Sequence, residues 1–310
     1  TRSMSDVPGN ANGLAENLDA EDISANNLFP LLSLPPELVA HTFSFLTLEQ
    51  RMRARACRDL SDIELQSKCW FDELALGEDG LAYFRTSCKD TAEQERPVEY
   101  IKRIARTTFI GELKIFVSDG ARFHDNFLIL IMEMKKIYQL KLVNEKGSTG
   151  VEDAIVDSLF LDLSRKCEML ELDDFGSVTA EALYTVYKAM LVGSGPLLFF
   201  FVPHIKKEIR DAFLQLIGVT LRNGELVSER RDIQAFSKPF CGGDGVSFLL
   251  FDGAIELTFC VRDIVEKLAS FRMMSHRFIG SRSYKKHKWE FEEGKRSYRE
   301  GMARVKIVKQ

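Results

Sequence analysis

The sequence predicts an α+β protein in which a small all-helical N-terminal unit precedes a larger α/β unit of alternating strands and helices. Three closely spaced helix-start signals, at Pro35-Pro36, Thr47 and Ser61, predict the helical unit. From residue 110 onward, short apolar segments typical of strands alternate with helical stripes at a nearly constant interval. The chain has 310 residues, of which 45% are hydrophobic, and can therefore bury a core in each unit.

The first predicted helix carries two apolar stripes. It starts at Leu34-Pro35-Pro36-Glu37, where proline occupies positions whose N–H groups would have no helical partner. The three-and-four spacing of a helix surface gives one stripe of Val39, Phe43 and Leu46 and a second of Leu38 and Phe45. A unit of about 45 residues needs only one such stripe for its own core. We therefore expect the second stripe to bind a partner.

A longer series of residues carries a family resemblance. Ser61 is expected to start a third helix that runs toward Trp70 and Leu74. The full series is Leu34-Pro35-Pro36-Glu37-Leu38, Phe43, Phe45-Leu46, Arg51-Met52-Arg53-Ala54-Arg55-Ala56-Cys57-Arg58, Trp70 and Leu74. On these residues, a stretch of about 43 residues resembles the F-box family, although Asp59-Leu60 stands where that family often has a tryptophan.

The resemblance implies a partner. F-box proteins dock onto a Skp-type adaptor, and through it onto a cullin–RING ubiquitin ligase of the SCF type. The residues expected to contact the adaptor are Leu34, Pro35, Pro36, Leu38, Phe43 and Leu46.

The second unit repeats a strand pattern, apolar-x-x-Leu-x-apolar, with Cys and Gly in first place in the last two copies. The four copies are Ile110–Ile115, Ile137–Leu142, Cys167–Leu172 and Gly195–Phe200. Their central leucines, at 113, 140, 170 and 198, are 27, 30 and 28 residues apart. A helical stripe follows each copy: Phe123/Phe127/Ile131, Val151/Ile155/Leu159/Leu163, Leu183/Val186/Tyr187/Met190 and Ile205/Ile209/Phe213.

This alternation, over about residues 105 to 220, resembles leucine-rich repeats. The resemblance implies a solenoid with a parallel sheet on one face and helices on the other. The asparagine that typically follows each strand is absent, since Ser118, Glu145, Phe175 and Pro203 occupy that position. A doubly wound α/β domain has the same alternation and is the alternative, although no glycine-rich loop follows any strand.

The open face of such a sheet is where we expect a protein substrate to bind. Residues that alternate with the buried leucines point to this face, and the candidates are Lys114, Phe116, Lys141, Glu171, Asp173, Phe199 and Phe201. If Phe199 and Phe201 are exposed, they form an apolar patch of the kind that marks an interaction site. The alternative is that the C-terminal segment covers them.

The repeat weakens after residue 220. Residues 246–251 and 254–259 read as strands, and Asp252-Gly253 between them is a strong hairpin signal. A helix with Ile264, Leu268 and Phe271 on one face is expected next, as part of an end cap. The segment from residue 272 carries a net charge of +8, whereas the whole chain carries −4.

These patterns give five segments. They are a disordered N-terminal segment (1–27), the F-box (28–76), a connector (77–97), the leucine-rich-repeat-like domain (98–271) and a basic C-terminal segment (272–310). The basic segment reads as a solvated face, an import signal or a nucleic-acid patch.

No catalytic residue, metal ligand set or cofactor motif emerges. The five histidines are isolated, the six cysteines include no CxxC pair, and no phosphate-binding or nucleophile motif is present. We find no apolar run long enough to span a membrane and no secretion signal, and therefore expect reduced cysteines and a cytoplasmic or nuclear location.

The sequence therefore predicts a non-catalytic substrate-recognition subunit of an SCF-type ligase. Two alternatives stay open. One is a scaffold protein that binds the adaptor without delivering a substrate, and the other is a nucleic-acid-associated protein that uses its basic C-terminus, although we expect no nucleic-acid partner.

Overall fold

The structure is a computed structural model. It describes residues 33–43, 45–46, 48–67, 69–77, 79–85, 94–117, 127–144, 155–173, 178–223, 225–228, 230–239, 245–262, 268–281 and 303–304. The predicted disordered segment 1–27 and most of the basic C-terminal segment lie outside these residues.

Three short helices form the N-terminal part, α1 (Pro36–Phe43), α2 (Leu48–Arg55) and α3 (Arg58–Gln66). The first helix begins at Pro36, as predicted. The third begins at Arg58 rather than Ser61, with Cys57 at its N-cap in extended conformation. It also ends earlier than predicted, because the backbone at Ser67 is extended and a strand follows.

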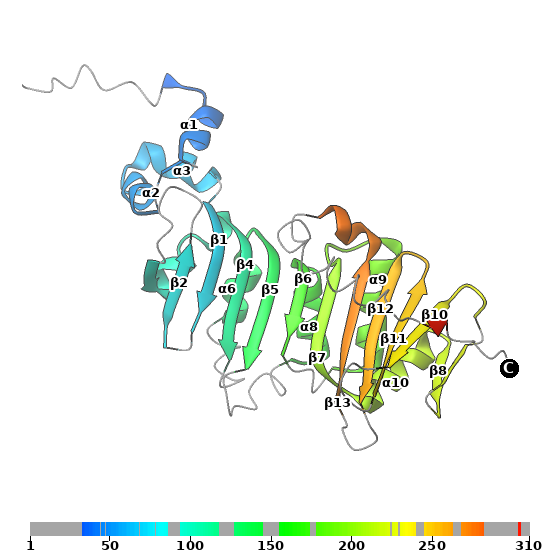
Figure 1. The fold of residues 1–310 in the computed structure, drawn as a ribbon. Helices are drawn as coiled ribbons and strands as arrows, with labels where there is room; N and C mark the ends of the chain where they lie inside the picture. Colours follow the sequence, from blue (N-terminus) through cyan, green and yellow to red (C-terminus); the bar gives the residue numbers. More distant parts are fainter. Residues whose placement is uncertain are drawn as a thin grey trace, which may run out of the picture.

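One sheet of twelve strands dominates the molecule, in the order β14-β10-β11-β12-β13-β7-β6-β5-β4-β1-β2-β3 (Figure 1). The first half of the chain supplies β1 (Cys69–Leu76), β2 (Leu81–Arg85), β3 (Gln94–Pro97), β4 (Thr108–Val117), β5 (Lys136–Asn144) and β6 (Cys167–Leu172). The second half supplies β7 (Phe199–Lys206), β10 (Gln234–Pro239), β11 (Gly245–Asp252), β12 (Ile255–Arg262), β13 (Leu268–Ser275) and β14 (Ala303–Arg304).

Five neighbouring strands, β1, β4, β5, β6 and β7, run parallel. The repeated leucines lie in register across them, with Leu74 beside Leu113, Leu113 beside Leu140 and Leu140 beside Leu170. All four are buried. Each copy of the repeat therefore forms one strand, and its leucine contributes one side chain to a row of core residues that crosses the sheet.

The repeat differs from the prediction at its first and last copies. Strand β1 carries the same pattern, Phe71-x-x-Leu74-x-Leu76, in a stretch where the F-box resemblance predicted helix. In the last copy, Phe200 rather than Leu198 is the partner of Leu170, so the true copy is Leu197-x-x-Phe200-x-Val202. The run of apolar residues from 197 to 202 gives no alternation that could fix this register.

Helices cover one face of the sheet (Figure 1). They are α4 (Val98–Lys102), α6 (Ile129–Glu133), α8 (Asp157–Ser164), α9 (Ala180–Val192) and α10 (Lys207–Leu216), with a short 3-10 turn, η3 (Ala105–Thr107). The predicted helical stripes are largely buried against the sheet at Phe127, Ile131, Ile155, Leu159, Leu163, Leu183, Val186, Tyr187, Met190 and Phe213. Phe123 and Val151 lie outside the described residues, and Ile205 belongs to β7.

The remaining strands are antiparallel, so the sheet is mixed and the prediction of a parallel sheet holds for its central part only. The predicted hairpin is present as β11 and β12, with Asp252 paired to Ile255. The predicted helix through Leu268 and Phe271 is wrong. Those residues lie in β13, where Phe271 and Met273 join the main core while Met274, between Met273 and Ser275, packs in a separate cluster with Phe199.

The domain boundaries change accordingly. Residues 69–76, predicted as the end of the F-box, form β1, and the predicted connector contributes β2 and β3. A separate hairpin of β8 (Val219–Arg222) and β9 (Glu225–Ser228) follows α10. In the described part of the chain, no helix has the length and apolar character needed to cross a membrane.

Candidate interaction surfaces

Helix α1 buries one of its two apolar stripes and exposes the other. Val39 and Phe43 are buried, whereas Leu38 is 52% exposed and Phe45, two residues beyond the end of α1, is 67% exposed. The exposed stripe continues into Pro35 and Pro36, which are also exposed. The second apolar stripe is therefore not buried by the other helices, and an exposed apolar stripe of this kind marks a candidate interaction surface.

The predicted adaptor-contact set is only partly accessible. Leu34 and Leu46 are half-buried, and Phe43 is buried, so Phe43 acts in packing α1 and does not offer a contact surface. Phe45, which was not in that set, is the most exposed of these apolar side chains and contacts the His41 ring edge-on at 5.0 Å between centroids.

Buried ionic groups hold α2 against α3. Glu64 on α3 is 1% exposed and pairs with Arg51 at 2.8 Å and with Arg55. Arg51 also donates to the hydroxyl of Ser67, just before β1. Arg55 donates to the backbone carbonyl of Arg103 at 2.8 Å, beyond α4, so the same network ties the helices to the sheet domain.

The face of the sheet opposite the helices is called here the open face. The candidate residues Lys114, Lys141, Glu171 and Phe201 lie on it in one register row, each beside the next. Lys141 and Glu171 form an ion pair at 3.4 Å. Phe116 lies beside Val143 one row further along, and an Asp173 carboxylate oxygen accepts from the backbone N–H of Asn144 at 3.2 Å.

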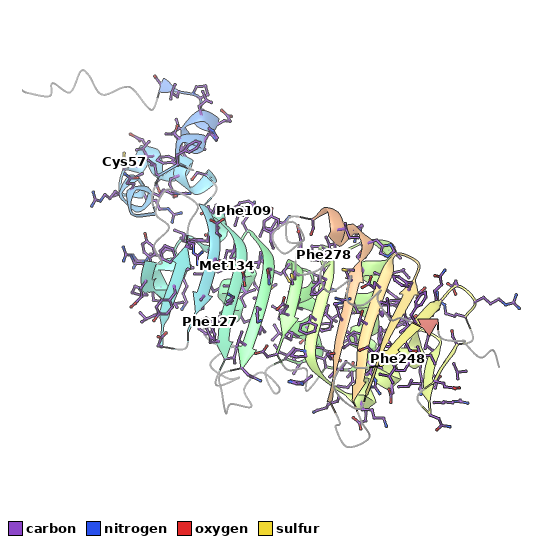
Figure 2. All side chains as sticks on the ribbon, in the orientation of Figure 1. Cys57, Phe109, Phe127, Met134, Phe248 and Phe278 are labelled. Carbon is purple, nitrogen blue, oxygen red and sulfur yellow. The ribbon has the colours of Figure 1, made fainter. Side chains whose placement is uncertain are left out.

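Phe199 lies on the open face but is not exposed there. This side chain is only 4% exposed and belongs to a small apolar cluster with Met169, Met274 and Phe278. Phe278, labelled in Figure 2, comes from η5 (His276–Gly280), a 3-10 turn directly after β13, and its ring stacks on Phe199. Phe201 is half-buried at the side of this cluster. The alternative, coverage by residues after 271, therefore holds for Phe199.

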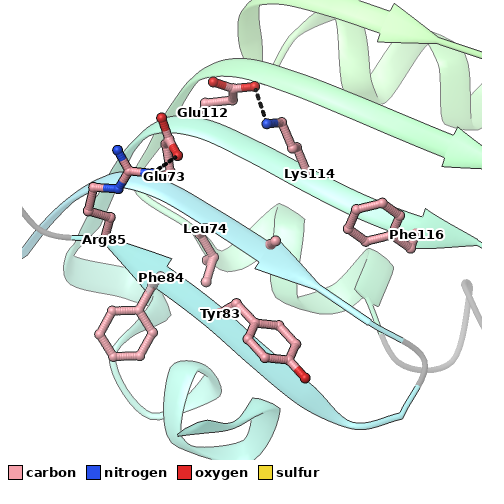
Figure 3. Close-up of a pocket in the computed structure, with 9 residues that line it drawn as sticks. Glu73, Leu74, Tyr83, Phe84, Arg85, Glu112, Lys114 and Phe116 are labelled. Carbon is pink, nitrogen blue, oxygen red and sulfur yellow. Dashed lines mark ion pairs between the residues drawn. The ribbon is translucent and has the colours of Figure 1, made fainter. Parts of the chain in front are cut away.

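A groove opens on the same face over β2, β1 and β4 (Figure 3). Its volume is about 280 Å³. Tyr83 and Phe116 flank it, and Ala75 lies between Tyr83 and Lys114 in register, so a small side chain forms its floor. Two of the candidate residues, Lys114 and Phe116, therefore line a real hollow.

The sequence did not reveal the other walls of the groove. Tyr83 and Arg85 lie in a segment predicted as a connector, and Glu73 in a segment predicted as helix. The missed signal was the copy of the repeat pattern at Phe71, Leu74 and Leu76, which would have predicted a strand with Glu73 and Ala75 on the open face.

In the ion pairs of the open face, the cation is more exposed to solvent than its carboxylate partner. In the groove, Arg85 pairs with Glu73 at 3.1 Å and Lys114 with Glu112 at 3.1 Å. The cations are 52% and 40% exposed, whereas the carboxylates are 36% and 9% exposed. The same order holds for the pairs Lys141–Glu171, Lys136–Glu168 and Arg272–Glu256. The cation is the more accessible partner in every one of these five pairs.

Aromatic side chains line the beginning of the parallel strands. The Trp70 ring lies 6.2 Å from Phe109 and 5.5 Å from Tyr138, and the Lys136 ammonium lies 4.3 Å from the Tyr138 ring centre. Partial burial would lower the pKa of Lys136, but the hydrogen bond and charge of Glu168 raise it above its ordinary value. Lys136 therefore stays charged at neutral pH.

Among the described residues, no three His, Cys, Asp or Glu side chains gather as metal ligands would. Cys167 is fully buried, and burial raises the pKa of its thiol, so it is not a nucleophile.

Comparison with known proteins finds no match: no family model, no curated protein and no solved structure resembles this chain significantly.

Proposed function

We propose that the chain is a substrate-recognition subunit of an SCF-type ubiquitin ligase. In this proposal, the exposed stripe of α1 docks onto a Skp-type adaptor and the open face of the sheet binds a protein substrate. The resemblance of residues 34–74 to the F-box family motivates the choice of adaptor. The observation that carries it is the division of the apolar residues in and just after α1. Val39 and Phe43 are buried, whereas Leu38 and Phe45 are exposed, as are Pro35 and Pro36.

The proposal assigns no chemistry to the chain. A receptor raises the effective concentration of a substrate lysine near an enzyme held elsewhere in the complex. It needs two separate binding surfaces on one body. The exposed stripe of α1 and the groove of the open face are two such surfaces, and the Arg55 hydrogen bond to the Arg103 carbonyl supports their fixed spacing.

The first experiment is a pull-down of purified Skp-type adaptor by the full chain, wild type beside a Pro35→Ala/Leu38→Ala variant. Both residues are exposed, so the substitutions are expected to leave the fold intact. Phe45→Ser provides a second exposed change on the same stripe, and Val192→Ser, on an exposed apolar residue of α9, is the matched control. Binding by wild type and control with loss in both stripe variants supports the proposal.

Absence of adaptor binding by a folded wild-type chain would remove the ligase assignment. Ubiquitylation of the bound partner protein distinguishes a receptor from a scaffold protein. A receptor promotes ubiquitylation of its bound partner in the presence of the complete ligase, whereas a scaffold protein binds the adaptor and leaves the partner unmodified.

A further inference from the structure

The open face has a covered part and an uncovered part. Over β7 and β13, η5 lays Phe278 on Phe199, and this part is apolar and closed. Over β2, β1 and β4 lies the groove, with Tyr83 and Phe116 at its sides (Figure 3). The part between β2 and β6, which contains the groove, is therefore the part considered for a binding site.

The uncovered part presents cations outward. Arg85, Lys114, Lys136 and Lys141 are each the more exposed member of an ion pair, and their carboxylate partners lie closer to the sheet. Lys114 and Lys141 are register partners on adjacent strands, which places their backbones about 5 Å apart. A ligand approaching this surface meets ammonium and guanidinium groups first, although the chain as a whole carries −4.

The groove beside these cations fits a single apolar side chain. Its volume of about 280 Å³ is just below the range of small-molecule pockets, and Ala75 forms its floor. The rings of Tyr83 and Phe116 offer the apolar and aromatic contact that anchors side chains at protein interfaces.

We infer that the open face between β2 and β6 binds an extended acidic segment of a partner protein, with one apolar side chain of that segment seated between Tyr83 and Phe116. Carboxylates of the segment contact Lys114 and Lys141. Nucleic acid is the less favoured polyanion, because a phosphate backbone needs a continuous positive stripe and the cations of this face are interspersed with carboxylates. An extended segment with a few carboxylates needs only separate cations. The inference names the substrate class within the proposed function and rests on it for its biological role.

The binding itself can be tested without any ligase component. A displayed library of random 12-residue peptides is selected on the immobilised full chain, and the best peptide is measured by fluorescence anisotropy. We expect enrichment of Asp and Glu around one aromatic or large aliphatic residue. Ala75→Leu, which fills the floor of the groove, and Lys114→Glu/Lys141→Glu are each expected to weaken binding about tenfold. Arg165→Glu, an exposed cation of another ion pair, is the matched control and should change affinity less than about twofold.

Several results would overturn the inference. One is the selection of basic or uncharged peptides, and another is the failure to select any peptide. A third is equal peptide affinity of the wild type, Ala75→Leu and Lys114→Glu/Lys141→Glu. Tighter binding of single-stranded DNA than of the best peptide would assign the face to nucleic acid instead. Marked tightening on removal of residues 1–27 would identify the chain's own acidic N-terminal segment as the occupant.

Controls keep the outcomes separate. Circular dichroism and thermal unfolding verify that each variant is folded, and Lys114→Gln/Lys141→Gln, which removes charge without reversing it, replaces the double Glu variant if that one unfolds. The adaptor pull-down is run on the same proteins. If the wild-type chain binds the adaptor but no acidic peptide, only the inference about the open face is contradicted. If it binds the acidic peptide but not the adaptor, only the ligase assignment is contradicted.

Discussion

Phe278 stacks on Phe199 with 5.1 Å between ring centroids and 29° between ring planes. The contact joins η5, at the end of β13, to the open face of β7. It closes an apolar cluster on the side of the sheet that the helices do not cover, and so decides which part of the open face remains available to a partner.

Removal of this ring is expected to destabilise the protein and expose the cluster. Phe278→Ala should cost about 3 kcal/mol, since a fully buried phenyl ring is lost and Phe199, Met169 and Met274 lose their cover. Urea unfolding measures the cost, and binding of a hydrophobic dye reports the exposed cluster. Ile279→Ala, at a neighbouring exposed position, is the control and should change stability by less than about 0.5 kcal/mol. Equal stability of the two variants would show that η5 does not hold the cluster closed.

A second prediction concerns Gly111 of β4, which lies close to the backbone of Asp72 in β1. A Cβ added at Gly111 would lie 2.6 Å from the backbone oxygen of Asp72, an atom that no side-chain rotation can move. Gly111→Ala is therefore expected to destabilise the protein by about 1–3 kcal/mol, because the two strands must separate. At Gly195 nothing lies within 4 Å of the added carbon, so Gly195→Ala is the matched control and should be neutral or slightly stabilising. Thermal unfolding of both variants would contradict the prediction if Gly111→Ala unfolded no earlier than the wild type.

The sequence predicted the strands in which apolar and polar residues alternate clearly. It missed strand β1, where a family resemblance indicated a helix, and misplaced the register of β7, where the residues are continuously apolar. Leu113, Leu140 and Leu170 each stand in an apolar-x-x-Leu-x-apolar segment, and all three form one core row. Leu74 belongs to the same row, but a family resemblance that expects helix there hid it. At Phe200 the surrounding apolar run has no polar residue to fix the register.

The candidate site was predicted in part for the same reason. Lys114, Phe116 and Lys141 were found by alternation along strands that were correctly assigned. Tyr83, Arg85 and Glu73 were missed because β2 is only five residues long and β1 was expected to be helical. Coverage of Phe199 depends on Phe278, 79 residues later, and no local pattern encodes a contact over that distance.

A third prediction addresses the ionic network of the N-terminal helices. Glu64→Gln keeps the shape of the side chain but leaves the buried Arg51 and the nearby Arg55 without their anionic partner. Loss of one partner from a buried ion pair costs about 3–5 kcal/mol. Hydrogen exchange should therefore accelerate in residues 48–67 and change little in the core strand β5. The matched control is Asp62→Asn, an exposed acid on the same helix, which should leave exchange unchanged. Unaltered exchange in the Glu64→Gln variant would mean that apolar packing alone holds these helices.

The last prediction concerns the buried thiol of Cys167. Burial, with a smaller contribution from Glu168, raises the pKa of this thiol above its ordinary value of 9.0. In the unfolded chain the thiol ionises near that value, whereas in the folded chain it keeps its proton. The folded state therefore binds more protons at high pH, and stability falls as pH rises above about 9. The contribution of this group to the free energy of unfolding should decrease by about 1.4 kcal/mol between pH 8 and pH 10.

Comparison with Cys167→Ala isolates that contribution, because the variant loses the thiol but keeps every other titrating group. Urea unfolding of both proteins at pH 8 and pH 10 should show a steeper loss of stability in the wild type. Alkylation gives an independent reading: the exposed Cys57 should react in the native protein, and Cys167 only after unfolding. Equal pH dependence of the two proteins, or rapid alkylation of Cys167 under native conditions, would contradict the assignment of this thiol to the core row that begins at Phe71 and continues through Ile110 and Ile137.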